Sequence, residues 1–114
     1  NEIILVMMDS NLESHLIGQA QQGKLNSNTL GLTPETVETL YKSASIVFEK
    51  MIKDGYDPIL LTSPVLRHTM FEFLTPILPD IHVLSYNDVS ADVHFKTYDR
   101  ISIHQAELKE NAPV

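Results

Sequence analysis

The chain has 114 residues, which is the usual size of one domain. Its hydrophobic content of 43% and charged content of 20% are typical of globular proteins and not of disordered segments. A net charge of −7 disfavours nucleic acid and anionic membrane surfaces as partners. Cysteine is absent, which excludes disulfides, thiolate nucleophiles and zinc–sulfur sites.

The first predicted element is a strand from Ile3 to Met8. Its continuous apolar run is typical of a strand that is covered on both faces. The run is too short for a membrane span or a signal peptide, and Asp9 ends it. Because the chain opens inside this strand without a starting methionine, we expect it to be part of a longer protein.

Two helices should follow. Ser10 and Glu13 have the spacing of a capping box, which places the start of the first helix at Ser10. After a polar loop, Thr33 and Pro34 predict the N-cap and first turn of a second helix. Apolar residues then recur at helical spacing to about Lys53 and define a core face: Val37, Leu40, Tyr41, Ala44, Phe48, Met51 and Ile52.

The second half repeats this pattern. Ile59 to Thr62 reads as a buried strand, and Ser63 is predicted to cap the next helix. Pro76 disfavours helical geometry at the residue before it, so this helix should end near Leu74. Its predicted core face consists of Leu66, Met70, Phe73, Leu74 and Ile77.

A third strand is expected from Ile81 to Leu84, and the alternation from Val93 to Tyr98 suits a half-exposed edge strand. Strands and helices that alternate with short connections predict an α/β fold, with a small, mainly parallel sheet flanked by helices. We expect residues 1–56 to form a strand plus two-helix subdomain and residues 57–106 an α/β subdomain. Residues 107–114 should be a flexible tail.

Metal and cofactor sites are not expected. No histidine has the partner spacing of a metal motif, although His82 and His94 could approach each other if their strands pair. No glycine pattern of a nucleotide site is present. The histidines are better interpreted as solvated or structural residues: His15, His68, His82, His94 and His104.

Catalysis is also not expected. Ser63 lies between a strand and a helix, as a nucleophile elbow does, but the glycines of the G-x-S-x-G turn are absent. Asp9 follows the first strand, as the acid of a receiver domain does, but no lysine follows a later strand. A helix-capping role explains Ser63, and a capping role for Asp9 or Ser10 suffices after the first strand.

A protein-contact surface is the remaining candidate. Phe71 lies outside the predicted core face and one helical turn after Arg67. An exposed aromatic beside an arginine suits a protein contact, whereas packing against a neighbouring loop would make Phe71 structural. The polar residues Glu72, Tyr86 and Asp88 complete the predicted contact set.

Two stretches carry a family resemblance. They are PILLTSPVLR at Pro58–Arg67 and LPDIHVLSYNDV at Leu78–Val89. These resemble the end of the type III protein-export gate family, which comprises FlhA of bacterial flagella and its injectisome counterparts. The segment from Ile3 to Glu13 and the start of the long helix at Leu32–Pro34 are similar to the same family. The ending at Tyr98–Ile101 is more similar to the injectisome members.

The resemblance implies that this chain is a cytoplasmic, ring-forming part of an export gate subunit. An N-terminal membrane domain outside this chain would attach the subunit to the bacterial inner membrane. The resemblance also implies neighbouring subunits, export chaperones, secreted substrates and other components of the apparatus as partners, and no enzymatic activity. Family members often carry further arginines after the Leu66–Arg67 pair. This chain has His68, Phe71 and Glu72 there, so contacts of those arginines would differ.

The alternative interpretation is a free-standing flavodoxin-like binding or regulatory domain. Such a fold places a ligand crevice at the carboxyl ends of its strands. A convergent polar pocket around Asp9, Ser63 and Ser85 would favour this alternative.

Overall fold

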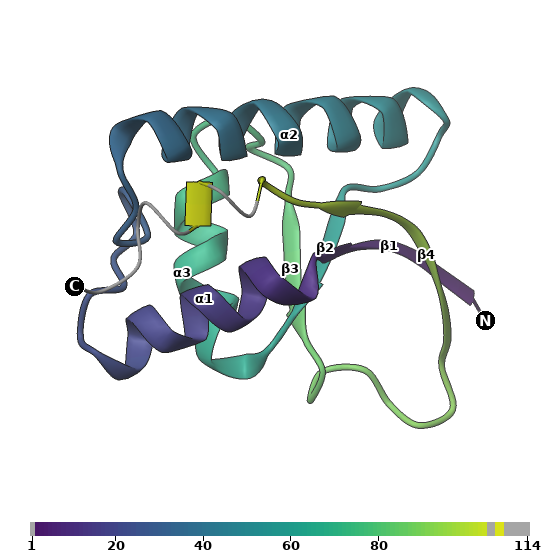
Figure 1. The fold of residues 1–114 in the computed structure, drawn as a ribbon. Coiled ribbons are helices and arrows are strands. Elements are labelled where there is room, and N and C mark those ends of the chain that lie inside the picture. Colours follow the sequence, from purple (N-terminus) through teal and green to yellow (C-terminus); the bar gives the residue numbers. More distant parts are fainter. Residues whose placement is uncertain (1, 105–106, 109–114) are drawn as a thin grey trace.

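The structure is a computed structural model that describes residues 2–104 and 107–108 (Figure 1). Three helices and four strands follow one another in the described part of the chain. In chain order they are β1 (Glu2–Met8), α1 (Ser10–Gln21), α2 (Pro34–Lys53), β2 (Ile59–Thr62), α3 (Pro64–Leu74), β3 (His82–Ser85) and β4 (His94–Ile101). No helix in the described ranges is both long and apolar enough to cross a membrane.

The four strands form one parallel sheet in the order β3-β2-β1-β4. The predicted α/β fold with a small parallel sheet is therefore confirmed. Val6 pairs with Leu60 of β2 on one side and with Asp99 of β4 on the other, where the register shifts by one residue after Leu5. Because β1 lies between β2 and β4, the segments predicted as two subdomains contribute to the same sheet.

Strand order corrects one expectation from the sequence. The β3 and β4 strands occupy opposite edges of the sheet, so His82 and His94 cannot approach each other through strand pairing. The predicted half-exposed edge strand is β4, and it continues to Ile101, which is buried.

One hydrophobic core joins all three helices to a single face of the sheet. Leu12 of α1, Phe48 of α2 and Phe73 of α3 are fully buried in it. The strands contribute Val6, Met8, Leu60, Val83 and Ile101 to the same core. In Figure 1, α2 runs along one side of the molecule while α1 and α3 lie together nearer the other.

The long helix α2 follows the predicted signals. Thr33 Oγ1 accepts a hydrogen bond from Thr36 N at 3.3 Å, and Pro34 occupies the first turn. Tyr41 stacks on Phe73 of α3 with ring centroids 4.4 Å apart, and its hydroxyl donates to the Phe73 carbonyl at 2.8 Å. These contacts fix α2 against α3.

The prediction of a buried core position is wrong for two residues. Ile52 near the end of α2 is 48% exposed, and Ile77 after α3 is 36% exposed. Ile52 lies in the last turn of α2 and Ile77 in the connection after α3, so neighbouring elements cover less of their surface. Of the predicted tail, Leu108 is buried against the core, and residues 109–114 lie outside the described residues.

A buried side chain of α1 binds the backbone of the connection between α1 and α2. Gln19 is a buried polar residue of α1, and its Nε2 donates to the Gly31 carbonyl at 2.7 Å. Gly31 has φ of 72°, a conformation that favours glycine. A Cβ there would lie 2.7 Å from the Lys24 carbonyl and 2.8 Å from Gln19 Nε2, so no larger residue fits without a shift.

Candidate functional site

The carboxyl ends of β1, β2 and β3 meet at one edge of the sheet because the strands are parallel. Asp9 follows β1, Ser63 follows β2, and Tyr86 follows β3. The stretches that carry the family resemblance in the sequence therefore come together at this edge, which we call the carboxyl edge.

The sequence predicted Ser10 as the cap of the first helix. In the structure Asp9 caps this helix instead. Asp9 Oδ2 accepts from Asn11 N at 3.0 Å and from Leu12 N at 3.3 Å. Asp9 N donates to the Ile101 carbonyl of β4 at 2.8 Å, which holds Asp9 at the sheet and outside the helix. Ser10 is then the first residue of α1.

Because the capping box does not form, the Glu13 carboxylate makes long-range contacts instead. Glu13 Oε2 accepts from Thr62 Oγ1 at 3.1 Å and from Ser63 N at 3.0 Å. The Tyr86 hydroxyl donates to Oε1 at 3.1 Å and to Oε2 at 3.2 Å. Burial raises the pKa of Tyr86, and the nearby Glu13 charge raises it further. One carboxylate thus joins α1 to the ends of β2 and β3.

Asp88 closes the turn after β3. Its Oδ2 accepts from Ser85 N at 2.8 Å and from Ser85 Oγ at 3.1 Å. The backbone hydrogen bond from Ser85 lowers the pKa of Asp88 most, followed by the bond from the Ser85 hydroxyl. The positive charge of Arg67 on α3 also lowers that pKa, to a smaller degree, so Arg67 attracts the Asp88 carboxylate.

Ser63 occupies the N-cap position of α3, but its side chain makes no capping hydrogen bond. Its Oγ is buried without a hydrogen-bond partner, and its backbone N–H is bound by Glu13. The predicted capping role of the Ser63 hydroxyl is therefore wrong, because this hydroxyl accepts no hydrogen bond from the first turn of α3. The carboxylates of Asp9, Glu13 and Asp88 at the carboxyl edge each accept hydrogen bonds from the chain itself.

The histidines do not gather into a metal-binding group within the described part of the chain. Within the described ranges, no three His, Cys, Asp or Glu residues are close enough to hold a metal ion together. His68 Nε2 pairs with Glu72 Oε1 on α3 at 3.2 Å. His15 Nε2 is buried without a partner, and burial lowers the pKa of His15.

The predicted contact residues fall into two groups. Arg67, Phe71 and Glu72 lie on α3, where Phe71 is 41% exposed and Arg67 is exposed. Glu72 also accepts a hydrogen bond from Ser27 Oγ of the α1–α2 connection at 2.7 Å. Tyr86 and Asp88 lie at the carboxyl edge. Glu72, Tyr86 and Asp88 therefore make contacts within the chain, and Phe71 is the main apolar surface of the set.

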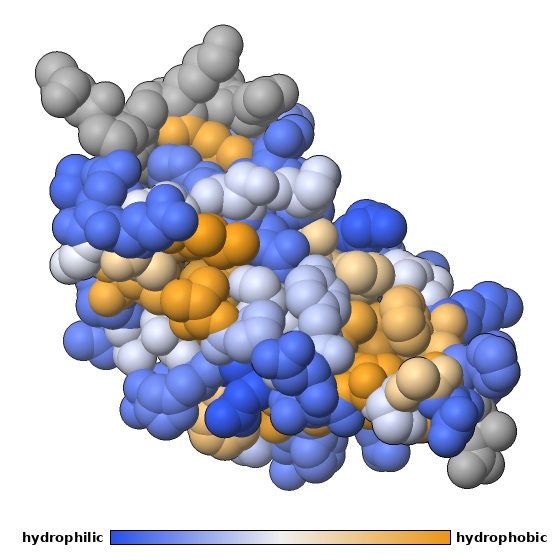
Figure 2. Space-filling model, turned by 90° about the horizontal axis from the view of Figure 1, so that it is seen from below, coloured by the Kyte–Doolittle hydropathy of each residue, from blue (hydrophilic) through white to orange (hydrophobic). Residues whose placement is uncertain are grey.

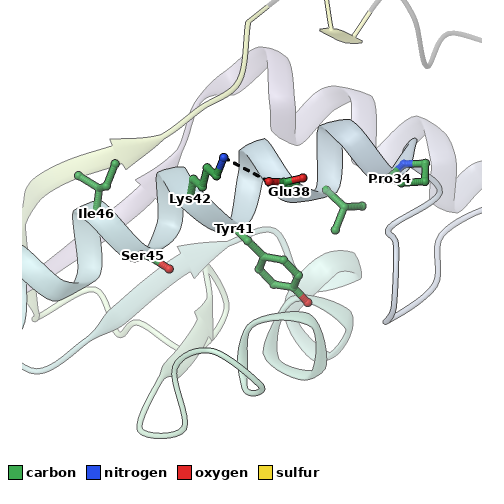
Figure 3. Close-up of a pocket in the computed structure, with 7 residues that line it drawn as sticks. Pro34, Glu38, Tyr41, Lys42, Ser45 and Ile46 are labelled. Carbon is green, nitrogen blue, oxygen red and sulfur yellow. Dashed lines mark ion pairs between the residues drawn. The ribbon is translucent and has the colours of Figure 1, made fainter.

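The structure shows a second surface that the sequence did not single out. Ile46 on the outer side of α2 is 70% exposed and lies between two shallow depressions. The first depression, of about 470 Å³, is shown in Figure 3 and is lined by Pro34, Val37, Glu38, Tyr41, Lys42, Ser45 and Ile46. An apolar residue outside the repeat of core positions is the signal that could have identified Ile46.

The chain matches known proteins over most of its length. The sequence profile of the FHIPEP family matches residues 1–94. LfhA of Escherichia coli strain K12, named as a truncated flagellar export/assembly protein, is 33% identical over 87 residues. That alignment covers 75% of this chain and 15% of LfhA, so the chain spans a small part of this relative.

Solved structures share the fold. The Chlamydia pneumoniae CdsV protein superposes with a TM-score of 0.71 at 25% identity, covering 90% of this chain and 29% of CdsV. The nonameric SctV-C of EPEC superposes with a TM-score of 0.60 at 16% identity, covering 89% of this chain and 29% of that one. From the profile match over residues 1–94, we conclude that the chain belongs to the FHIPEP family, the type III protein-export gate family.

Proposed function

We propose that this chain is a cytoplasmic part of an export gate subunit, which forms a ring and helps to dock chaperone–substrate complexes for protein export. The observation that carries the proposal is the family match over residues 1–94. The likeness to CdsV over 90% of the chain supports it. In this proposal the whole protein lies at the bacterial inner membrane, and the chain itself has no catalytic role.

Subunit contacts are part of the proposal. SctV-C is described as nonameric, and it shares this fold. We propose that copies of the present protein assemble in a similar ring, with export chaperones, secreted substrates and other components of the apparatus as further partners. A surface that serves such contacts needs apolar anchors with a polar rim.

The end of α3 is the candidate for such an anchor. Phe71 is 41% exposed, and the charged residues Arg67 and Glu72 lie beside it on the same helix. Truncation of an apolar anchor in an interface can cost about 2 kcal/mol or more of binding free energy. An exposed ion pair contributes only about 0–1 kcal/mol, so loss of Arg67 alone should weaken a contact without abolishing it.

The test is secretion by cells whose full-length protein carries Phe71→Ala or Arg67→Glu. Val65→Ala is a matched control, because Val65 is 56% exposed and also lies on α3. We expect reduced export with Phe71→Ala, a smaller reduction with Arg67→Glu, and normal export with Val65→Ala, at equal protein levels and melting temperatures. Normal export in all three variants would remove this part of α3 from the functional proposal.

A further inference from the structure

The three helices of the described chain all pack on one face of the sheet and leave the other face without a helix. The core that contains all three helices includes Val6, Leu60 and Val83, but it does not include Leu5 or Leu61. Side chains alternate between the two faces along a strand, so the residues next to these core positions point to the opposite face. We call this the open face, and its apolar residues are Ile3, Leu5, Met7, Ile59, Leu61, Leu84 and Phe95.

The connection between β3 and β4 covers only part of the open face. Val89, Ala91 and Val93 of this connection line a cavity of about 280 Å³ together with Leu61 and Phe95. Beyond this cover, Phe95 remains 47% exposed, and partial exposure extends to Ile3, Met7, Ile59 and Leu84. Figure 2 shows apolar surface at the end of the molecule where the chain begins.

A parallel sheet with one face only partly covered is unusual, because parallel sheets occur almost always with both faces covered. The apolar run of β1 has the pattern of a strand that is buried on both sides. Leu5 is fully buried, but its neighbours Ile3 and Met7 on the same face are not. The open face therefore has the character of an internal surface that lacks its second layer.

We propose that the open face is covered by the part of the same polypeptide that precedes Asn1. Ile3 belongs to the open face and lies near the start of the described chain, so a preceding segment would be close to this face. The described end of the chain lies on the other side of the sheet, since Leu108 packs into the core with the helices. This chain covers 29% of CdsV, so most of a protein of that length lies outside residues 1–114.

One physical argument favours this occupant over a second copy of the chain. A covalently attached segment meets the face at an effective concentration in the millimolar range for a short linker. The proposal does not depend on chaperone docking or on ring formation.

The experiment is site-specific photo-crosslinking in cells that make the full-length protein. Benzoylphenylalanine replaces Phe95, an aromatic residue of similar shape, or Ile3 as a second position on the open face. The control replaces Ile46, which is 70% exposed on the outer side of α2. Mass spectrometry of the irradiated protein then identifies the peptide that is joined to each position, without any reference to export activity.

We expect crosslinks within one polypeptide from position 95 or position 3 to residues upstream of Asn1. The control at position 46 should not give these crosslinks. A crosslinked dimer, or a crosslink to another protein, would overturn the proposal in favour of a second copy or a separate partner. Absence of any crosslink at both open-face positions would also overturn it, as would a native gene that encodes no segment before Asn1.

Discussion

The hydroxyl of Tyr86 donates a hydrogen bond to the carboxylate of Glu13, which lies 73 residues earlier in the chain. The same carboxylate binds Thr62 and Ser63 at the end of β2. Glu13 therefore connects the stretches by which the sequence resembles the export gate family. We therefore expect the loss of the Glu13 carboxylate to weaken the contact between these separated stretches.

Replacement Glu13→Gln should destabilise the fold. Hydrogen bonds to a charged group contribute about 1.5–3 kcal/mol each, but Glu13 is partly exposed, so we expect a loss of about 1–2 kcal/mol in the free energy of unfolding. Urea denaturation measures this change. The control Glu49→Gln removes the same charge from an exposed position of α2 and should change the free energy by less than about 0.5 kcal/mol. Equal effects of both substitutions would contradict the role of Glu13.

Asp88 should make stability depend on pH in the acidic range. The hydrogen bonds from Ser85 lower its folded pKa below the usual 3.8, so the folded state favours the charged carboxylate. This stabilisation is fully present above the unfolded pKa and is lost as the pH falls through the lower folded pKa. Wild type should therefore be more stable than Asp88→Asn at pH 7, and the difference should shrink below about pH 4. Urea denaturation of both proteins between pH 7 and pH 3 measures the difference, and a constant value throughout would refute the prediction.

Truncation of Leu40 or Phe48 to alanine should be strongly destabilising. Both side chains are fully buried on the inner side of α2. Such substitutions remove apolar contacts and leave a cavity, at a cost of about 2–5 kcal/mol. Ile46→Ala on the outer side of the same helix is the matched control, and it should cost less than about 0.5 kcal/mol. Thermal or urea unfolding that ranks Ile46→Ala beside Leu40→Ala would show that α2 packs differently.

Two glycines allow a matched test of the α1–α2 connection. Gly23 and Gly31 have nearly equal φ values of 71° and 72°. A Cβ at Gly23 meets no atom within 4 Å, whereas a Cβ at Gly31 meets Lys24 and Gln19 at less than 3 Å. Gly23→Ala should cost about 1–2 kcal/mol through backbone conformation alone. Gly31→Ala should cost more in urea unfolding, and an equal cost would exclude the close contact.

Local signals in the sequence predict much of the fold. The apolar runs of β1 and β2 and the cap, proline and apolar repeat of α2 are each contained in a short stretch of chain. The parallel α/β class follows from their order. The ends of elements are less well predicted, and Ile52 in the last turn of α2 and Ile77 in the connection after α3 remain partly exposed.

The site depends on long-range contacts that the sequence does not reveal. Ser10 and Asp9 are both suitable caps, and the hydrogen bond from Asp9 N to Ile101 decides between them. The Glu13 carboxylate then accepts hydrogen bonds from distant residues and does not form the capping box. Strand order likewise separates His82 from His94, although both lie on strands. The exposure of Phe71 fits the predicted contact surface. The protein that contacts Phe71 is part of the proposed function.

The most direct test of the account is protein export by cells from whose full-length gene the codons for residues 1–114 are deleted in frame. The proposed function predicts loss of secreted flagellar or injectisome substrates, while the truncated protein remains present at normal levels. A plasmid that supplies the intact gene should restore export, and one carrying Glu13→Gln should restore it less well. Undiminished export after the deletion would contradict the proposal that this chain is a working part of an export gate.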